Sequence, residues 1–161
     1  MQSLESILVA VDFSACSRAA LRLAGTLAQA TGARIDVLHV WHSPAFVSPG
    51  TLVGSVGAPS QPLLDVIRVR AEESLKTLVD EIRSEGIAVT DAKLLQGDPA
   101  STIIDEAKRG GYHLVALGTH GRTGLQHLLL GSVAEKVVRL AKVPVLTVRH
   151  PDEGERTPVS K

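Results

Sequence analysis

A glycine-rich segment between residues 118 and 132 holds the residue types and spacing best suited to chemistry. The segment begins GTHGRTG at residue 118 and ends with GS at residues 131–132. Glycines at positions 118, 121 and 131 allow positive φ and a close approach of the backbone, so that consecutive N–H groups can turn toward an anion. Gly131 and Ser132 open an expected helix, whose N-terminus offers unpaired N–H groups and a partial positive charge to a phosphate. The pattern predicts a phosphate-binding loop, and the alternative is an ordinary strand-to-helix loop with turn glycines.

The spacing in this loop differs from the two common phosphate-binding motifs. No Gly-Lys-Ser/Thr follows, which excludes a Walker loop, and G-x-G-x-x-G is absent, which excludes the dinucleotide fingerprint. The Ser132 hydroxyl is placed either to cap its helix or to donate to a phosphate oxygen. Arg122 is the only Lys or Arg between Gly118 and Ser132, and it is either a phosphate ligand or a solvated side chain. His120 is more often a polar loop residue in such a place.

Alternating apolar runs and helical patterns must position this loop. Strands are expected at residues 7–11, 34–40, 88–95, 113–117 and 143–148. Helices are expected at residues 14–31, along the apolar stripe of residues 64–82, from residue 99, and at residues 132–141. This alternation predicts an α/β fold with right-handed crossovers and a five-stranded parallel sheet with helices on both faces. Two strand orders are plausible for five strands, and we expect the commoner one, 3-2-1-4-5, in which the first strand is central.

The strand order predicts where a ligand would bind. In this order the topological switch lies between strands one and four, and ligands bind at the carboxyl ends of the strands that flank the switch. Those ends carry Asp12 and Gly118. Asp12 is therefore expected to contact a nucleotide, the alternative being that it caps the following helix.

Smaller signals mark the connections between these elements. Asp98 is expected as an N-cap with Pro99 at the first helical position, and Gly86 is expected to end the long helix. Residues 42–62 are rich in Pro, Gly, Ser and Val, and loops of this length are usually functional or mobile. Trp41 begins that loop and either covers the site or packs in the core.

Composition restricts the classes of protein and partner. A length of 161 residues fits one domain over residues 1–150, with a polar, disordered tail expected at residues 151–161. Because 17 Lys and Arg balance 17 Asp and Glu, and aromatics are only 2%, nucleic acid is not an expected partner. The single cysteine, Cys16, excludes an internal disulfide. The first apolar run is too short for a signal or membrane segment, so a cytoplasmic location without membrane contact is expected.

Taken together, these segments resemble the universal stress protein family. The pattern Gly118-x2-Gly121-x9-Gly131-Ser132 is similar to the signature of its ATP-binding branch. ILVAVDFS at residues 7–14 resembles the first strand, HV at 39–40 the end of the second, GDPA at 97–100 the third helix start, and VPVLTV at 143–148 the last strand. The resemblance covers roughly residues 3–149 and implies a Rossmann-like nucleotide-binding fold.

The resemblance also implies a ligand and roles for individual residues. The ligand would be ATP, with Mg²⁺ held through the phosphates. Asp12 would accept a hydrogen bond from the adenine or ribose edge. The remaining implied contacts run from the adenine slot to the phosphates: Ala10, Val11, Val40 and Leu117 at the base, Gly118, Gly121 and Arg122 at the ribose and phosphates, with His120 beside them, and Gly131, Ser132 and Val133 at the phosphates.

Three functions remain open at this point. The first is a binding module that signals cellular state or supports stress resistance through an unknown protein partner. The second is a slow ATP hydrolase, and the third is a nucleotide-free dimeric interaction protein. Because residues 118–132 contain no acidic residue to position water, the binding module is favoured. The apolar edge strand at residues 143–148 predicts a homodimer through two-fold antiparallel pairing.

Overall fold

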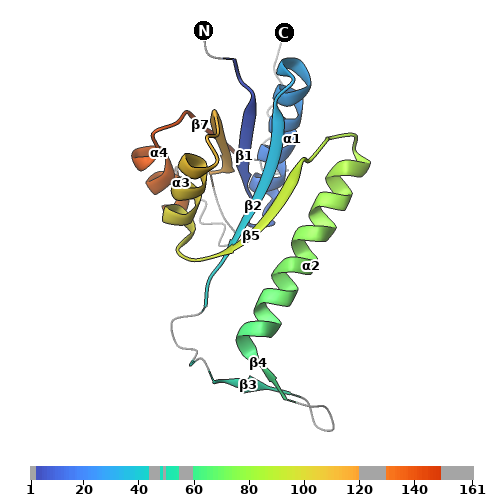
Figure 1. The fold of residues 1–161 in the computed structure, drawn as a ribbon, viewed down its shortest axis with the longest axis vertical. Helices are drawn as coiled ribbons and strands as arrows, with labels where there is room; N and C mark the ends of the chain where they lie inside the picture. The colour runs from blue at the N-terminus through green and yellow to red at the C-terminus, as the bar shows by residue number, and fades with distance from the viewer. Residues whose placement is uncertain (1–2, 44–47, 49, 55–59, 120–129, 150–161) are drawn as a thin grey trace, which may run out of the picture.

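A five-stranded parallel sheet forms the centre of the molecule. The structure is a computed structural model that describes residues 3–43, 48, 50–54, 60–119 and 130–149. The strands of the sheet are β1 (Ser6–Ala10), β2 (Arg34–Trp41), β5 (Asp91–Gln96), β6 (Leu114–Gly118) and β7 (Val145–Val148). Their order is β5-β2-β1-β6-β7, and every pair is parallel. Numbered along the sheet's own strands this is 3-2-1-4-5, so the predicted fold class is confirmed (Figure 1).

Helices cover both faces of this sheet and give the domain two apolar cores. One core joins Ile7 and Val9 of β1 to α1 (Ala15–Thr31) and α2 (Leu63–Ser84). The other joins Leu8 and Ala10 to α3 (Pro99–Arg109) and α4 (Ser132–Leu140). Because its side chains are buried on both faces, β1 is a continuous apolar run rather than an alternating one.

Two strands begin later than the sequence suggests. The third strand of the sheet was expected from residue 88, but β5 begins at Asp91. There the carbonyl of Val89 accepts from the Arg83 guanidinium at 2.9 Å instead of joining the ladder. The last strand was expected from residue 143, but β7 begins at Val145. Pro144 has no N–H to donate, although its carbonyl accepts from Val115 N at 3.0 Å.

The predicted helix boundaries at Asp98 and Gly86 are confirmed. The Asp98 side chain accepts from Ser101 N and Pro99 follows in the first turn of α3. After α2, Gly86 takes a φ of +86°, a left-handed conformation that favours glycine at this place.

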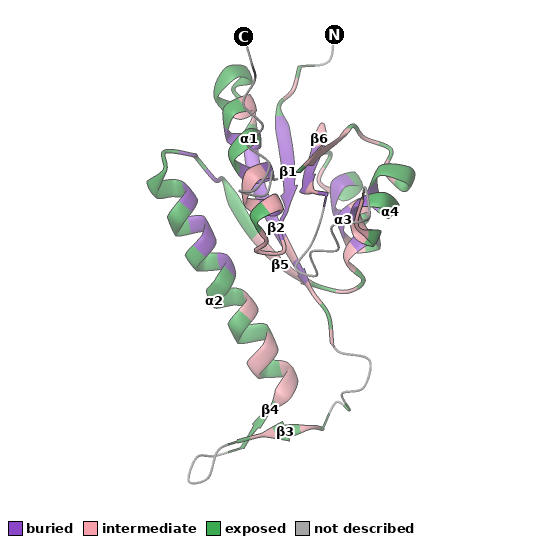
Figure 2. Ribbon diagram, turned by 180° about the vertical axis from the view of Figure 1, so that it is seen from behind, coloured by how far each residue is buried: buried purple, intermediate pink, exposed green. Residues whose placement is uncertain are grey.

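The long connection before α2 is more structured than the expected loop. Within residues 42–62 the structure contains β3 (Leu52–Val53) and β4 (Gln61–Pro62), which pair antiparallel. Figure 1 shows this pair, with the N-terminal half of α2, beyond the carboxyl ends of the sheet strands. Figure 2 shows that the buried part of α2 is its C-terminal half, where Leu75, Leu78, Val79 and Ile82 lie. The N-terminal half therefore overhangs the edge of the sheet to which the sequence assigned a ligand.

Candidate functional site

A cavity of about 600 Å³ opens at the carboxyl ends of the central strands. Its floor comes from the ends of β1, β2 and β6. The first turns of α3 and α4 form one wall, and the N-terminal half of α2 contributes to the other. A volume of this size falls within the range of about 300–1,000 Å³ that small-molecule sites usually have.

Nine of the predicted site residues lie together in this cavity. They come from three strand ends and the start of α4: Ala10, Val11, Asp12, Val40, Leu117, Gly118, Gly131, Ser132 and Val133. Three further predicted residues, His120, Gly121 and Arg122, fall outside the described residues. The expected tail at residues 151–161 also falls outside them. The parallel sheet thus brings distant segments of the sequence to one edge, where the expected ligand contacts would be made.

Asp12 follows β1 and points its carboxylate into a turn that leads to α1. Its Oδ1 accepts from Ser14 N at 3.1 Å and from Ser14 Oγ at 2.6 Å. Ser14, not Asp12, is the N-cap of α1, because the Ser14 hydroxyl accepts from Ser17 N. No hydrogen bond to Asp12 Oδ2 occurs within the part of the chain that the structure describes. One carboxylate oxygen thus fixes the turn.

The residue after Asp12 holds the turn in an unusual backbone conformation. Phe13 has a φ of 68°, in a region that bulky side chains rarely adopt and that is concentrated at functional sites. Its ring contacts the His39 ring at 4.3 Å between centroids. His39 Nδ1 lies 2.7 Å from the carbonyl oxygen of Val11. Because a carbonyl only accepts, this nitrogen carries the proton and the imidazole is fixed against the end of β1.

Gly118 ends β6 directly against the first turn of α1. A Cβ at this position would lie 2.7 Å from Cys16 Cβ and 2.8 Å from Ser17 N, which is closer than real Cβ atoms approach their neighbours. The expectation that the glycines supply positive φ is wrong for Gly118, which is absent from the positive-φ residues, and for Gly131, whose φ is −70°. Close packing of strand against helix is what requires glycine at position 118.

The start of α4 supplies hydrogen-bond donors to the cavity. Gly131 is the N-cap, and its own N–H donates to Thr119 O at 2.7 Å, so this amide is not among those free for an anion. Ser132 is the first helical residue, and no side chain caps the helix, so the alternative in which Ser132 is the cap is wrong. The amides of Ser132, Val133 and Ala134 belong to the first turn, where N–H groups have no partner within the helix. These amides and the helix dipole suit an anionic group.

The sequence did not assign the residues that α2 and α3 bring to the cavity. These are Ile67, Arg70, Ala71 and Ser74 from α2 and Pro99 and Ile103 from α3, joined by Phe13, Ser17, His39 and His42. The length of α2 was a signal in the sequence that could have identified its part in the cavity. The 22 residues of α2 span about 33 Å at 1.5 Å per residue, whereas the five residues of β1 span about 17 Å. A helix that long must overhang a sheet of such strands.

Residues 3–43, 48, 50–54, 60–119 and 130–149 contain no group of three or more His, Cys, Asp or Glu side chains placed to share a metal ion. In the same ranges, no helix combines the length and the apolar character that spanning a membrane requires.

Comparisons with known proteins identify the family and agree with the fold. Residues 4–149 match the model of the universal stress protein family. The universal stress protein YxiE of Bacillus subtilis is 35% identical over 145 residues, which cover 89% of this chain and 97% of the relative.

Solved structures show the same architecture. The universal stress protein UspA of Lactobacillus plantarum superimposes with a TM-score of 0.72 at 24% identity, covering 92% of this chain and 100% of that one. A universal stress protein from Archaeoglobus fulgidus, solved in complex with dAMP, gives a TM-score of 0.62 at 27% identity and covers 91% and 99% of the two chains. The protein described here belongs to the universal stress protein family.

Proposed function

We propose that this protein binds an adenine nucleotide, ATP, in the strand-end cavity and acts in the cytoplasm as a nucleotide-dependent module in stress resistance. The observation that carries the proposal is the meeting of the first turn of α4 with Asp12 in one cavity of about 600 Å³. A helix N-terminus favours phosphate, and a carboxylate accepts from the amino group or hydroxyls of a nucleoside. The dAMP held by the relative from Archaeoglobus fulgidus supports an adenine nucleotide as the ligand.

The polarity of the cavity suggests how the nucleotide lies. Ala10, Val11 and Val40 offer an apolar slot between the ends of β1 and β2, which suits a base. On the face of the sheet that Ala10 and Val40 share with α4, Ser132 and Val133 present their amides, which suit the phosphates. The ribose would then lie near Gly118, where β6 ends, with Asp12 accepting from the base or sugar edge. Mg²⁺ would be held through the phosphates.

We favour binding over hydrolysis as the function of the site. Efficient phosphoryl transfer needs a group that orients the attacking water and cations that clamp the γ-phosphate. Among the described residues that line the cavity, Asp12 is the one acidic side chain, and Ser14 already engages its Oδ1. We therefore expect bound ATP to persist rather than turn over, and to be read by a partner protein.

The test removes a single amide from the first turn of α4. Proline is favoured at the first helical position, and the extended conformation of Gly131, with a ψ of 157°, suits a residue that precedes proline. Ser132→Pro should therefore preserve the helix while deleting one N–H and the hydroxyl. We expect ATP affinity measured by calorimetry to fall about ten- to a hundredfold. Ser132→Ala, which deletes only the hydroxyl, should have a smaller effect.

Two outcomes would contradict the proposal. One is a wild-type protein that binds no ATP in calorimetry and releases no nucleotide on denaturation. The other is a Ser132→Pro variant that unfolds at the wild-type temperature and still binds ATP with wild-type affinity.

A further inference from the structure

The overhanging half of α2 faces the cavity with a stripe of its own. Ile67, Arg70, Ala71 and Ser74 are spaced by three, one and three residues, so they share one side of the helix. Farther along α2, Leu75, Leu78, Val79 and Ile82 are buried against the sheet. In Figure 1 the N-terminal half of α2 lies beyond the strands, so its stripe meets the ligand cavity instead of the core.

Arg70 differs from the other basic residues of α2 in its ion pairs and hydrogen bonds. Arg68 pairs with Glu72 at 3.3 Å, Lys76 pairs with Asp80 at 2.6 Å, and Arg83 donates to the carbonyl of Val89. Arg70 makes no ion pair or hydrogen bond with the described residues, and the residue one turn after it is Ser74. Its guanidinium is thus free to meet a ligand in the cavity that it lines.

The charged side chains that line the cavity indicate a role for the Arg70 guanidinium. Of the lining residues that the structure describes, Arg70 is the one Lys or Arg, and Asp12 is the one Asp or Glu. The amides of α4 contribute only partial charge to a phosphate. A full positive charge nearby would stabilise a nucleotide with several phosphates and would offset the negative charge that Asp12 adds to the same cavity.

We propose that Arg70 binds a phosphate group of the nucleotide from the wall opposite α4, which makes α2 part of the binding site. The inference rests on the proposed function, because it adds a ligand to the same site. Arginine suits this role because its planar fork of N–H donors can meet two phosphate oxygens at once. The bound phosphates would then be held between α4 on one side of the sheet and α2 on the other.

The test compares two arginines of the same helix. Affinities for ATP, ADP, AMP and adenosine are measured for wild type, for Arg70→Gln and for Arg68→Gln, which removes the same charge outside the cavity. Trp41 is the single tryptophan of the sequence and lines the cavity, so its fluorescence reports occupancy alongside calorimetry. We expect Arg70→Gln to weaken ATP about tenfold and to leave adenosine within twofold. Arg68→Gln should leave all four ligands within twofold, and Arg70→Lys should restore part of the loss.

Each contrary result has a distinct meaning. If wild type binds ATP and Arg70→Gln binds it as tightly as Arg68→Gln does, the inference fails and the proposed function stands. If Arg70→Gln weakens adenosine as much as ATP, Arg70 contacts the nucleoside and the phosphate role is overturned. If wild type binds none of the four ligands, the proposed function and the inference fail together.

Discussion

The two edge strands of the sheet, β5 and β7, both have an unpaired edge but differ in the residues that they carry. Each leaves backbone N–H and C=O groups unpaired along one side, which invites pairing with another chain. On β5, Asp91 and Lys93 place charges on the face that α3 covers. On β7, the residues Val145, Leu146, Thr147 and Val148 carry no charge and are all partly exposed. One edge carries charges that oppose pairing with another chain, and the other edge carries none.

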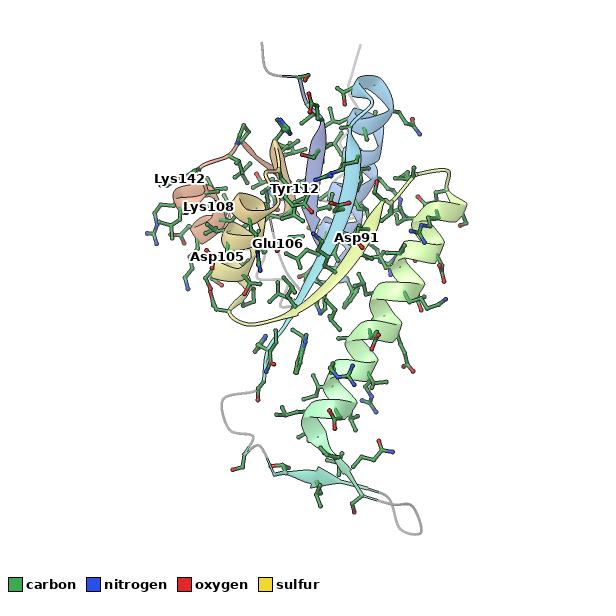
Figure 3. All side chains as sticks on the ribbon, in the orientation of Figure 1. Asp91, Asp105, Glu106, Lys108, Tyr112 and Lys142 are labelled. Atoms are coloured by element: carbon green, nitrogen blue, oxygen red, sulfur yellow. The ribbon has the colours of Figure 1, made fainter. Side chains whose placement is uncertain are left out.

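The charged edge belongs to a buried polar network. Lys93 Nζ donates to Glu106 at 2.7 Å and to Tyr112 Oη at 3.1 Å, and Tyr112 Oη donates to Asp36 at 2.6 Å. Asp36, Glu106 and Tyr112 are each no more than 6% exposed. Figure 3 shows Glu106 and Tyr112 on the side of the sheet that α3 covers. The network ties α3 to two strands, so the charge on β5 also helps to hold the fold together.

The apolar edge supports the proposal that the protein is a homodimer through β7. The carbonyls of Pro144 and Val148 accept from the N–H groups of Val115 and Thr119. The backbone N–H and C=O groups of the even-numbered residues of β7 therefore point toward β6. Neighbouring residues of a strand point their backbone groups to opposite sides, and Val145 and Thr147 therefore face outward. Two-fold antiparallel pairing would satisfy these groups in both copies.

The largest expected effect is the loss of the proposed dimer in Thr147→Pro. Proline removes an outward N–H and blocks a pairing strand, but it is tolerated on an edge whose N–H faces solvent. Wild type should sediment as a dimer at micromolar concentration and Thr147→Pro as a folded monomer, with at least about a hundredfold weaker association. Thr147→Val keeps the N–H and should remain dimeric.

Thr147→Pro tests the pairing more sharply than a charge placed on the same strand would, for example in Leu146→Asp. Leu146 also packs against the core that β1, α1 and α2 share, so a charge there would disturb the monomer as well. A wild-type monomer, or a Thr147→Pro dimer as tight as wild type, would contradict pairing through β7.

A smaller effect is expected when the charge of β5 is removed. Lys93→Met should lower the free energy of unfolding by about 2 kcal/mol, because the largely buried Glu106 loses its partner. Arg109 remains beside Glu106 at 2.9 Å and limits the loss. Chemical denaturation would measure it, with Lys76→Met as the control. Lys76 pairs with Asp80 on the surface, and such exposed pairs contribute little to stability. Equal losses in the two variants would contradict a structural role for the β5 charge.

The smallest expected effect concerns alkaline pH. Hydrogen bonds from Lys93 to Glu106 and Tyr112 raise the pKa of Lys93. Burial, followed by the hydrogen bond to Asp36, raises the pKa of Tyr112. In both cases the unfolded chain loses its proton first, at a pH of about 10. The stabilisation is therefore complete below that pH and is lost as the pH rises through the folded pKa values.

Tyr112→Phe tests this pH dependence. It should cost about 1 kcal/mol near neutral pH, because Asp36 loses its hydrogen bond in a buried place. It should also make the fall of stability above a pH of about 10 shallower than in wild type. Denaturation midpoints measured from neutral to alkaline pH would show both effects. A variant whose midpoint falls as steeply as wild type would contradict the role of Tyr112 in this titration.

The sequence by itself determined the parallel sheet and much of the cavity. Apolar runs such as ILVAV after residue 6 are buried on both faces, and this pattern is typical of covered parallel strands. Once the sheet is parallel, its carboxyl ends meet at one edge. Asp12, Gly118 and Ser132 could therefore be placed together from local patterns alone.

Only the tertiary structure decided which residues lie across the cavity from Asp12, Gly118 and Ser132. Periodicity shows that one side of α2 is apolar, but the sheet ends before the helix does, so Arg70 faces the cavity and Leu78 the core. The requirement for glycine at position 118 comes from Cys16 and Ser17, about a hundred residues away in sequence. The local sequence pattern indicates which chemical groups a segment carries. Which groups meet depends on lengths and packing distances that are set only when the elements assemble.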